Sequence, residues 1–237
     1  MATAGASLYR RQPGRSYPRG EPYQTLAWYS RNGTEWDGPA EIGDPGWWIW
    51  RITWREGAFY GIGKPADFAS PRLYRGTEDA RPAVWSENMF GAGSDRRGSE
   101  ASLLFLADGR ALCVMRGKDA AGGDDAKAML GRSNPPYKEW EWQSLEFQIG
   151  GPHLAVMPDG RIVVAGRYYG KPRETRLWWL DPTSGRLDHF LTLSKDYDAS
   201  YCGLVFHDGL LWVSYYAGTK QKAAIYLAKV NLPPPAN

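Results

Sequence analysis

Several patterns that mark common protein classes are missing from this sequence. Its 237 residues include two cysteines and three histidines, so neither a disulfide framework nor a set of regularly spaced metal ligands is indicated. It has no block of five or more like charges, and its formal net charge is +3, which argues against a nucleic-acid partner. No apolar run approaches the roughly 20 residues of a membrane span, and the first residues lead into a polar, basic stretch rather than a secretory signal. We therefore expect no metal, no cofactor and no membrane span.

The residues that are abundant point to β-structure. The chain has twelve Trp, fourteen Tyr and 28 Gly. Trp and Tyr favour the pleated surface of a sheet, and Gly favours tight turns. The length is enough for one domain with a large core. Composition therefore predicts an all-β domain.

A hairpin pattern recurs along the chain. An apolar run, an Asp-Gly or Glu-Gly pair and a second apolar run surround Gly57, Gly109, Gly160 and Gly209, and these glycines follow one another at steps of 52, 51 and 49 residues. Such a pair between apolar runs is typical of two antiparallel strands joined by a tight turn. A near-constant step of this size, with strands inside each repeat, predicts a β-propeller.

The repeats divide the chain into blades of a single domain that spans residues 1–237. The expected blades cover about residues 5–42, 47–86, 100–147, 150–193 and 198–232. The first would lack its innermost strand and the last its outermost strand, because the prolines after Leu232 end the ladder. We therefore expect four to five blades of a six-bladed ring whose N-terminal part is missing. The alternative is a five-bladed ring that closes irregularly.

Polar residues gather where the blades would meet the central channel. The first strand of each blade lines that channel, and the second strand returns to the same side. The candidate residues at these positions are Arg51, Glu100, Arg116, His153, Arg167, Asp198, Ser200 and Tyr201. Three arginines, two carboxylates, a tyrosine and a histidine would thus converge from four blades.

The segment Ser30-Arg-Asn-Gly-Thr-Glu-Trp36 resembles the Asp-box, a structural turn whose pattern is Ser-x-Asp-x-Gly-x-Thr-Trp or one residue shorter. Asn32 stands where the pattern has Asp, and Glu35 stands where it has Thr. The Asp-box belongs to the sialidase (neuraminidase) superfamily of six-bladed propellers, in which it is not catalytic.

Two further stretches resemble the same superfamily more specifically. One runs from Glu100 through an apolar strand and an Asp-Gly turn to Arg116. The other is Ser200-Tyr-Cys-Gly-Leu204, followed by His207-Asp-Gly, which resembles the stretch that carries the family's nucleophilic tyrosine. The resemblance implies a retaining glycosidase in which Tyr201 is the nucleophile, Glu100 is its base and Arg116 binds the substrate carboxylate.

The resemblance also implies a ligand and a compartment. The ligand would be a glycan with a terminal acidic sugar, contacted by Arg116, Arg167 or Arg51, and by His153 and Asp198. The family is secreted, periplasmic or cell-surface, although no signal peptide is visible. The family's first substrate-binding arginine and its acid come from its first blades, and no Arg-Ile-Pro-like or Arg-Asp-Pro-like segment is present here. We therefore expect this chain alone to be inactive unless a missing N-terminal blade is supplied.

Other interpretations of the same residues remain open. Tyr201 and Glu100 would also suit a non-catalytic propeller that binds carbohydrate or protein on its channel face, where they would satisfy each other. Arg116 and Arg167 would then pair with channel carboxylates, and His153 would be a packing residue. A propeller that acts on another sugar is a third possibility, since one fold hosts many functions. In each case, open blade edges would favour self-association.

Overall fold

The computed structural model describes residues 2–6, 24–77, 81–121, 123, 126–196, 198–219 and 221–234. All the regular elements in this part of the chain are β-strands, and they form five antiparallel sheets in chain order. The predicted all-β propeller class is therefore confirmed. Within these residues, no helix is long and apolar enough to cross a membrane.

Three of the five sheets have four strands and two have three. The first sheet holds β1 (Ala2–Ala6), β2 (Gln24–Tyr29) and β3 (Asp37–Ile42). The second holds β4 (Trp47–Arg55), β5 (Ala58–Pro65), β6 (Arg72–Thr77) and β7 (Ala83–Ser86). The third holds β8 (Arg97–Phe105), β9 (Ala111–Lys118), β10 (Met129–Ser133) and β11 (Glu141–Ser144). The fourth holds β12 (Ile149–Val156), β13 (Ile162–Tyr168), β14 (Glu174–Leu180) and β15 (Leu187–Ser194). The fifth holds β16 (Asp198–His207), β17 (Leu210–Gly218) and β18 (Ala223–Val230).

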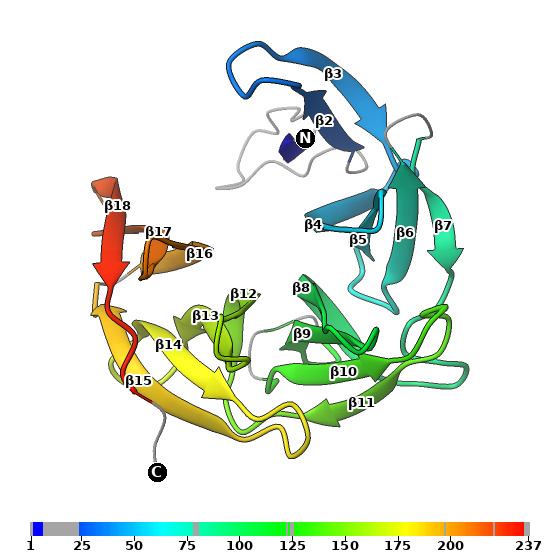
Figure 1. The fold of residues 1–237 in the computed structure, drawn as a ribbon. Helices are drawn as coiled ribbons and strands as arrows, with labels where there is room; N and C mark the ends of the chain where they lie inside the picture. The colour runs from blue at the N-terminus through cyan, green and yellow to red at the C-terminus, as the bar shows by residue number, and fades with distance from the viewer. Residues whose placement is uncertain are drawn as a thin grey trace.

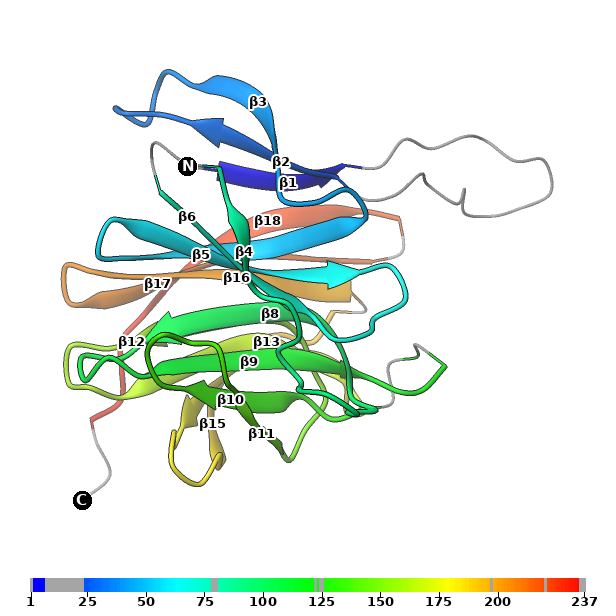
Figure 2. The same ribbon diagram turned by 90° about the vertical axis from the view of Figure 1, so that its right-hand side faces the viewer.

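The sheets follow one another around an arc (Figure 1). The strands β4, β8, β12 and β16 lie nearest its centre, and the first and fifth sheets form its two ends. No described strand joins these two ends. Seen side-on, the hairpin turns of the blades lie on one side of the arc (Figure 2), so the starts of the first strands and the ends of the second strands share the other side.

The four turn glycines lie in the left-handed region that the sequence pattern requires. Their φ angles are 73° at Gly57, 92° at Gly109, 85° at Gly160 and 76° at Gly209. Non-glycine residues reach this region only at a cost in backbone strain, so glycine is the residue that such a turn favours. Each glycine joins the first two strands of its sheet, as predicted.

Apolar clusters fill the spaces between successive sheets. One cluster joins the second and third sheets around Leu73 and Met115, and another joins the third and fourth around Val114 and Trp178. A third joins the fourth and fifth sheets around Leu177. Successive side chains of a strand point to opposite faces of its sheet, so every middle sheet packs one face on each of its two neighbours.

The first strand of each of the four complete hairpins contains a β-bulge near its start. The pairing register shifts between Ile49 and Ile52, Gly98 and Ala101, Gly150 and His153, and Ser200 and Gly203. A bulge leaves residues without ladder partners and re-aims their side chains. The two residues released in each bulge are Trp50 and Arg51, Ser99 and Glu100, Gly151 and Pro152, and Tyr201 and Cys202.

The first predicted blade, at about residues 5–42, is described only in part, because residues 7–23 lie outside those described. The described strand there is β1, which ends at Ala6 and pairs with β2.

The segment that resembles the Asp-box forms a turn between β2 and β3. The Asn32 side chain accepts hydrogen bonds from the backbone N–H groups of Thr34 and Glu35 at 2.9 Å each. Elsewhere in the chain, Cys113 and Cys202 are buried and unpaired.

Candidate functional site

Glu100 is the residue on which the site converges. It is 5% exposed and comes from the bulge in β8. Its Oε1 accepts a hydrogen bond from the Tyr201 hydroxyl at 2.9 Å. Its Oε2 accepts hydrogen bonds from Nη1 of Arg116 at 2.8 Å and from the backbone N–H of Gly151 at 2.9 Å. Groups from the third, fourth and fifth sheets therefore hold one carboxylate in a fixed orientation.

Tyr201 lies in an unusual backbone conformation. Its φ is 54°, a region that large side chains rarely adopt without a structural or functional reason. Its ring packs edge-on against Trp50 at 5.0 Å between centroids and lies 5.6 Å from the ring of Tyr216. Partial burial and the adjacent Glu100 carboxylate raise the pKa of Tyr201 above its ordinary value. The phenol therefore stays protonated near neutral pH unless a base removes its proton.

Gly151 occupies the bulge of β12 that faces Tyr201. Its φ is 55°, and a Cβ at this position would lie 2.4 Å from Cδ1 of Tyr201. The absence of a side chain here lets the tyrosine ring reach Glu100. No sequence pattern at Gly150-Gly-Pro-His153 indicated this close approach.

Arg167 holds the other carboxylate of the site. It comes from the end of β13 and forms an ion pair with Asp198, and it also donates a hydrogen bond to the Tyr216 hydroxyl. The Tyr216 hydroxyl in turn donates to Oδ1 of Asp198 at 2.7 Å. Arg167 and Asp198, two of the predicted site residues, thus lie together beside Tyr201.

Three arginines surround the ring of Tyr169, which follows β13. The Cζ atoms of Arg116, Arg167 and Arg173 lie 5.2, 5.8 and 5.5 Å from the ring centroid. Such distances place each guanidinium in cation–π range. Arg116 and Arg167 are mostly buried, whereas Arg173 is exposed. This cluster, Arg116, Arg167 and Arg173 around Tyr169, is the arginine cluster of the site.

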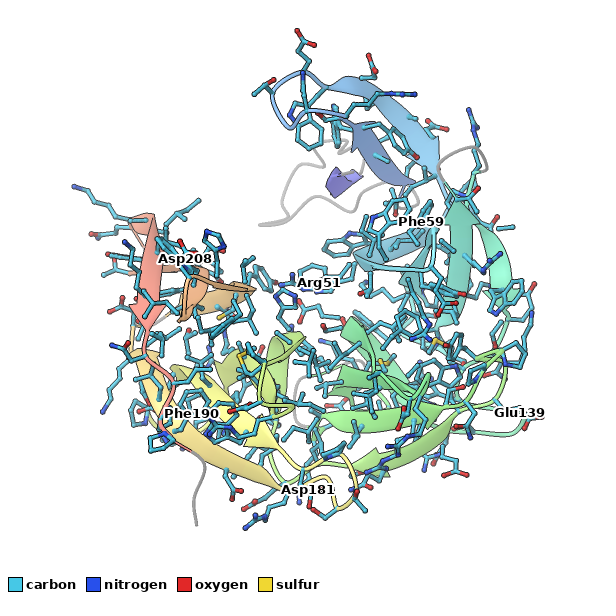
Figure 3. The ribbon with its side chains drawn as sticks, in the orientation of Figure 1. Arg51, Phe59, Glu139, Asp181, Phe190 and Asp208 are labelled. Carbon is cyan, nitrogen blue, oxygen red and sulfur yellow. The ribbon has the colours of Figure 1, made fainter. Side chains whose placement is uncertain are left out.

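Arg51 and His153 support the bulge that carries Tyr201. Arg51 points from β4 toward the middle of the arc (Figure 3), and its Nη2 donates to the backbone oxygen of Cys202 at 2.7 Å. His153 Nδ1 lies 3.1 Å from the backbone nitrogen of Leu204 and 3.0 Å from the Cys202 oxygen. In one tautomer Nδ1 accepts a hydrogen bond from the Leu204 N–H group, and in the other it donates one to the Cys202 oxygen. Burial, together with the nearby Arg51 charge, lowers the pKa of His153 to about 3, so the ring is neutral.

Lys64 adds a further cation that the sequence analysis did not select. It is 4% exposed, and its Nζ lies 4.6 Å from the ring centroid of Phe68, which also has Nζ of Lys118 at 4.8 Å. Burial, with smaller contributions from Lys118 and Arg116, lowers the pKa of Lys64 to about 8 against the opposing effect of Glu100.

Two residues of the site could have been found from the repeat itself. The position seven residues after each turn glycine is occupied by Lys64, Arg116, Arg167 and Tyr216. In each sheet this position lies near the C-terminal end of the second strand. The sequence analysis used this position for the two arginines alone. Arg173 lies in a connection between strands, and no repeat position indicates it.

A cavity also lies away from this site, at the outer part of the third sheet. Its volume is about 770 Å³, and it is lined by Arg110, Arg132 and the connection from β10 to β11 that includes Trp140. Glu139 of this connection lies at the outer rim of the arc (Figure 3), far from the centre where Arg51 points. Among the described residues, no three His, Cys, Asp or Glu side chains are grouped to hold a metal ion.

Comparison by sequence gives no family. No protein-family model matches the chain, and no curated protein does either.

Comparison by structure gives the fold. A protein of unknown function from Dyadobacter fermentans superposes with a TM-score of 0.75 at 17% identity, over 95% of this chain and 67% of that one. An endo-arabinase from Bacteroides thetaiotaomicron superposes with a TM-score of 0.64 at 12% identity, over 90% and 87% of the two chains. An exo-β-1,3-galactanase from Phanerochaete chrysosporium gives a TM-score of 0.62 at 11% identity, over 89% and 54%. At these identities the likeness concerns the fold alone, which is a β-propeller of the kind found in glycoside hydrolases.

Proposed function

We propose that this chain binds the terminal acidic sugar of a glycan near the centre of the arc, on the side where the first strands start and the second strands end. We propose further that Tyr201 and Glu100 carry out a sialidase-like hydrolysis there. The observation that supports the proposal best is the 2.9 Å hydrogen bond from the Tyr201 hydroxyl to Glu100 Oε1. A tyrosine is a weak nucleophile while it is protonated, and an adjacent base activates it. Glu100 stands where that base is needed.

The arginine cluster supplies the chemistry for an acidic sugar. Guanidinium groups bind a carboxylate through paired hydrogen bonds, which fix both its position and its orientation. Arg116 and Arg167 are held in place by Glu100 and Asp198, and exposed Arg173 lies beside them at the ring of Tyr169. A sugar carboxylate at this cluster would place its anomeric carbon near the neighbouring Tyr201.

The proposed reaction follows from these positions. The Tyr201 oxygen bonds to the anomeric carbon while its proton passes to Glu100, and the bond from that carbon to the leaving oxygen breaks. Water then displaces the tyrosine, Glu100 returns its proton to the tyrosine oxygen, and the proton that the attacking water loses passes to solvent. A charged carboxylate on the substrate favours a neutral phenol over a second carboxylate as nucleophile, and sialidases use a tyrosine.

The leaving oxygen also needs a proton when it is an ordinary sugar hydroxyl. Within the described residues, the other carboxylate of the site is Asp198, and it is engaged by Arg167 and Tyr216. A 4-methylumbelliferyl sialoside does not need this acid, because its phenolate leaves without protonation. Turnover of this substrate therefore tests Tyr201 and Glu100 by themselves.

The decisive experiment compares the wild-type chain with Tyr201→Phe on this activated substrate, with binding of 3′-sialyllactose measured alongside. The inactivity expected of this chain alone concerns sialosides whose leaving oxygen needs an acid, so on the activated substrate we expect measurable turnover by the wild type. We expect a loss of about 10²-fold or more in the variant, and similar binding by both. Equal turnover by the two proteins would eliminate Tyr201 as the nucleophile.

The engaged state of Asp198 also favours a second candidate function, a propeller that binds acidic sugars without cleaving them. This alternative predicts binding of 3′-sialyllactose with no turnover of the activated sialoside. Absence of both binding and turnover would reject the acidic-sugar proposal in either form.

A further inference from the structure

The cavity at the outer part of the third sheet lies on the side of the arc that carries the hairpin turns. Arg110, which lines it, follows the turn at Gly109, and the Tyr137 hydroxyl of the β10–β11 connection donates to the Gly109 oxygen at 2.8 Å. The candidate site opens on the other side (Figure 2). We call this cavity the turn-side cleft. Its volume of about 770 Å³ is within the usual range for a small-molecule site.

The wall of the turn-side cleft is held in one shape. The Trp85 indole N–H donates to the Pro136 oxygen at 2.6 Å, and the Trp140 indole N–H donates to the Tyr137 oxygen at 3.2 Å. Tyr137 is 5% exposed and has a φ of 65°. A buried tyrosine keeps this left-handed conformation only where its surroundings fix it, and such residues often mark binding sites. An ordered wall loses little entropy when a ligand binds.

The charges at the back of the cleft are balanced. Arg110 forms an ion pair with Asp108 at 2.7 Å. Arg132 stands opposite Glu141 in the pairing of β10 with β11. The Arg132 guanidinium also donates to two backbone oxygens of the β14–β15 connection, at 2.7 and 2.9 Å. Each arginine is therefore held in place beside a carboxylate, so the cleft does not select an anion as the arginine cluster does.

The rim of the cleft combines polar and flat apolar groups. Lys138 and Glu139 are exposed there and add one charge of each sign. Pro135, Pro136 and Trp140 supply the apolar part of the lining. A sugar hydroxyl both donates and accepts hydrogen bonds, and the C–H face of a sugar ring packs on flat apolar surfaces. Balanced charge, many hydrogen-bonding groups and a flat apolar part together suit a neutral carbohydrate.

We propose that the turn-side cleft is a second carbohydrate site, which binds a neutral oligosaccharide segment. Glu139 at its rim lies at the outside of the arc, whereas Arg51 points to the centre (Figure 3). The two sites therefore bind their ligands independently. A neutral segment carries no carboxylate for the arginine cluster, so this site stands or falls separately from the acidic-sugar proposal.

The test is binding of lactose, cellotriose and chitotriose, measured by calorimetry and by saturation-transfer NMR. We expect at least one of them to bind with a dissociation constant in the millimolar range or below, and with little dependence on salt, because the ligand is uncharged. Glu139→Ala and Trp140→Ala should each weaken binding by about tenfold or more, through a lost acceptor and a lost flat surface. Glu146→Ala is the matched control, since Glu146 is exposed and follows β11 but does not line the cleft.

Circular dichroism and denaturant unfolding of the variants separate loss of the site from loss of the fold. Glu139 is exposed, so Glu139→Ala decides the outcome if Trp140→Ala lowers stability. The proposal is overturned if none of the three sugars binds to the wild type, or if Glu139→Ala binds as tightly as Glu146→Ala. It is also overturned if Arg173→Gln weakens binding as much as Glu139→Ala does, which would place the sugar at the arginine cluster instead.

Discussion

The Tyr201 hydroxyl donates to Glu100 Oε1 at 2.9 Å across 101 residues of sequence. The contact joins the bulge of the fifth sheet to the bulge of the third, with Gly151 of the fourth sheet between them. The candidate site therefore depends on how the third, fourth and fifth sheets are arranged.

Glu100→Gln should abolish the proposed base while preserving its shape. We expect turnover of the activated sialoside to fall by about 10²–10⁴-fold, because an amide does not accept the Tyr201 proton. The variant also weakens the ion pair with Arg116, so some stability is lost. Glu174→Gln is the control, since Glu174 is equally buried and paired with Arg176. Comparable loss of turnover in both variants would show a structural effect rather than a chemical one.

Gly151→Ala should displace the Tyr201 ring. The new methyl group would lie 2.4 Å from Cδ1 of Tyr201, so the ring must move away from Glu100. Gly160→Ala has a similar backbone cost, with a φ of 85°, but nothing lies within 4 Å of its added Cβ. Both should lose roughly 1 kcal/mol of unfolding free energy from the left-handed conformation. In denaturant titrations and sialoside assays, we expect Gly151→Ala alone to lose turnover; unchanged turnover would contradict the close packing.

Arg173→Gln should weaken binding of an acidic sugar without affecting stability. Arg173 is exposed and contacts the Tyr169 ring at 5.5 Å, so its removal leaves no buried group unpaired. We expect 3′-sialyllactose affinity to fall by about 10-fold or more, which corresponds to a charge-assisted hydrogen bond of about 1.5–3 kcal/mol. The control is Arg186→Gln, an exposed arginine paired with Asp188. Equal affinities of the two variants for the sugar, measured by calorimetry, would remove Arg173 from the site.

His153→Asn should reduce the acid sensitivity of the fold. Burial holds the pKa of His153 at about 3, whereas an unfolded histidine has a pKa of about 6.5. Between these values the unfolded chain takes up a proton that the folded chain does not. The free energy of unfolding therefore falls as pH is lowered from about 6.5 to about 3, by up to about 1.4 kcal/mol per pH unit.

Asn keeps an acceptor for Leu204 but does not titrate, so the variant should show a shallower decline over this range. His207→Asn, at an exposed histidine beside Asp208, is the control and should follow the wild type. The measurement is denaturant unfolding at several pH values, and identical slopes for wild type and His153→Asn would refute the assignment.

The fold was accessible from sequence because its turns are local. Each hairpin turn is set by a few residues around Gly57, Gly109, Gly160 or Gly209. The near-constant number of residues between these glycines then indicates the β-propeller fold. The structure also brings together Glu100 and Tyr201, which both lie near the start of a first strand, and their chemical roles stay a prediction.

Other features depend on tertiary contacts that no pattern showed. The bulges arise from packing around the centre of the arc, so the role of Gly151 as the space for the Tyr201 ring was not foreseen. Arg51 and His153 were expected to contact substrate, and the structure places their polar groups on the Cys202–Leu204 backbone. Arg173 comes from a connection outside the repeat, and its approach to Tyr169 depends on how that connection folds.

The bulges of the four first strands have a consequence for how such a protein changes over time. Each frees two neighbouring residues from the ladder at the same place, while the paired residues on either side keep the sheet together. Substitutions at these freed positions alter what the centre of the molecule recognises and leave the hydrogen bonds that define the blade intact. Exposed residues among those freed, such as Tyr201, can therefore vary while the backbone pairing of the blade is kept.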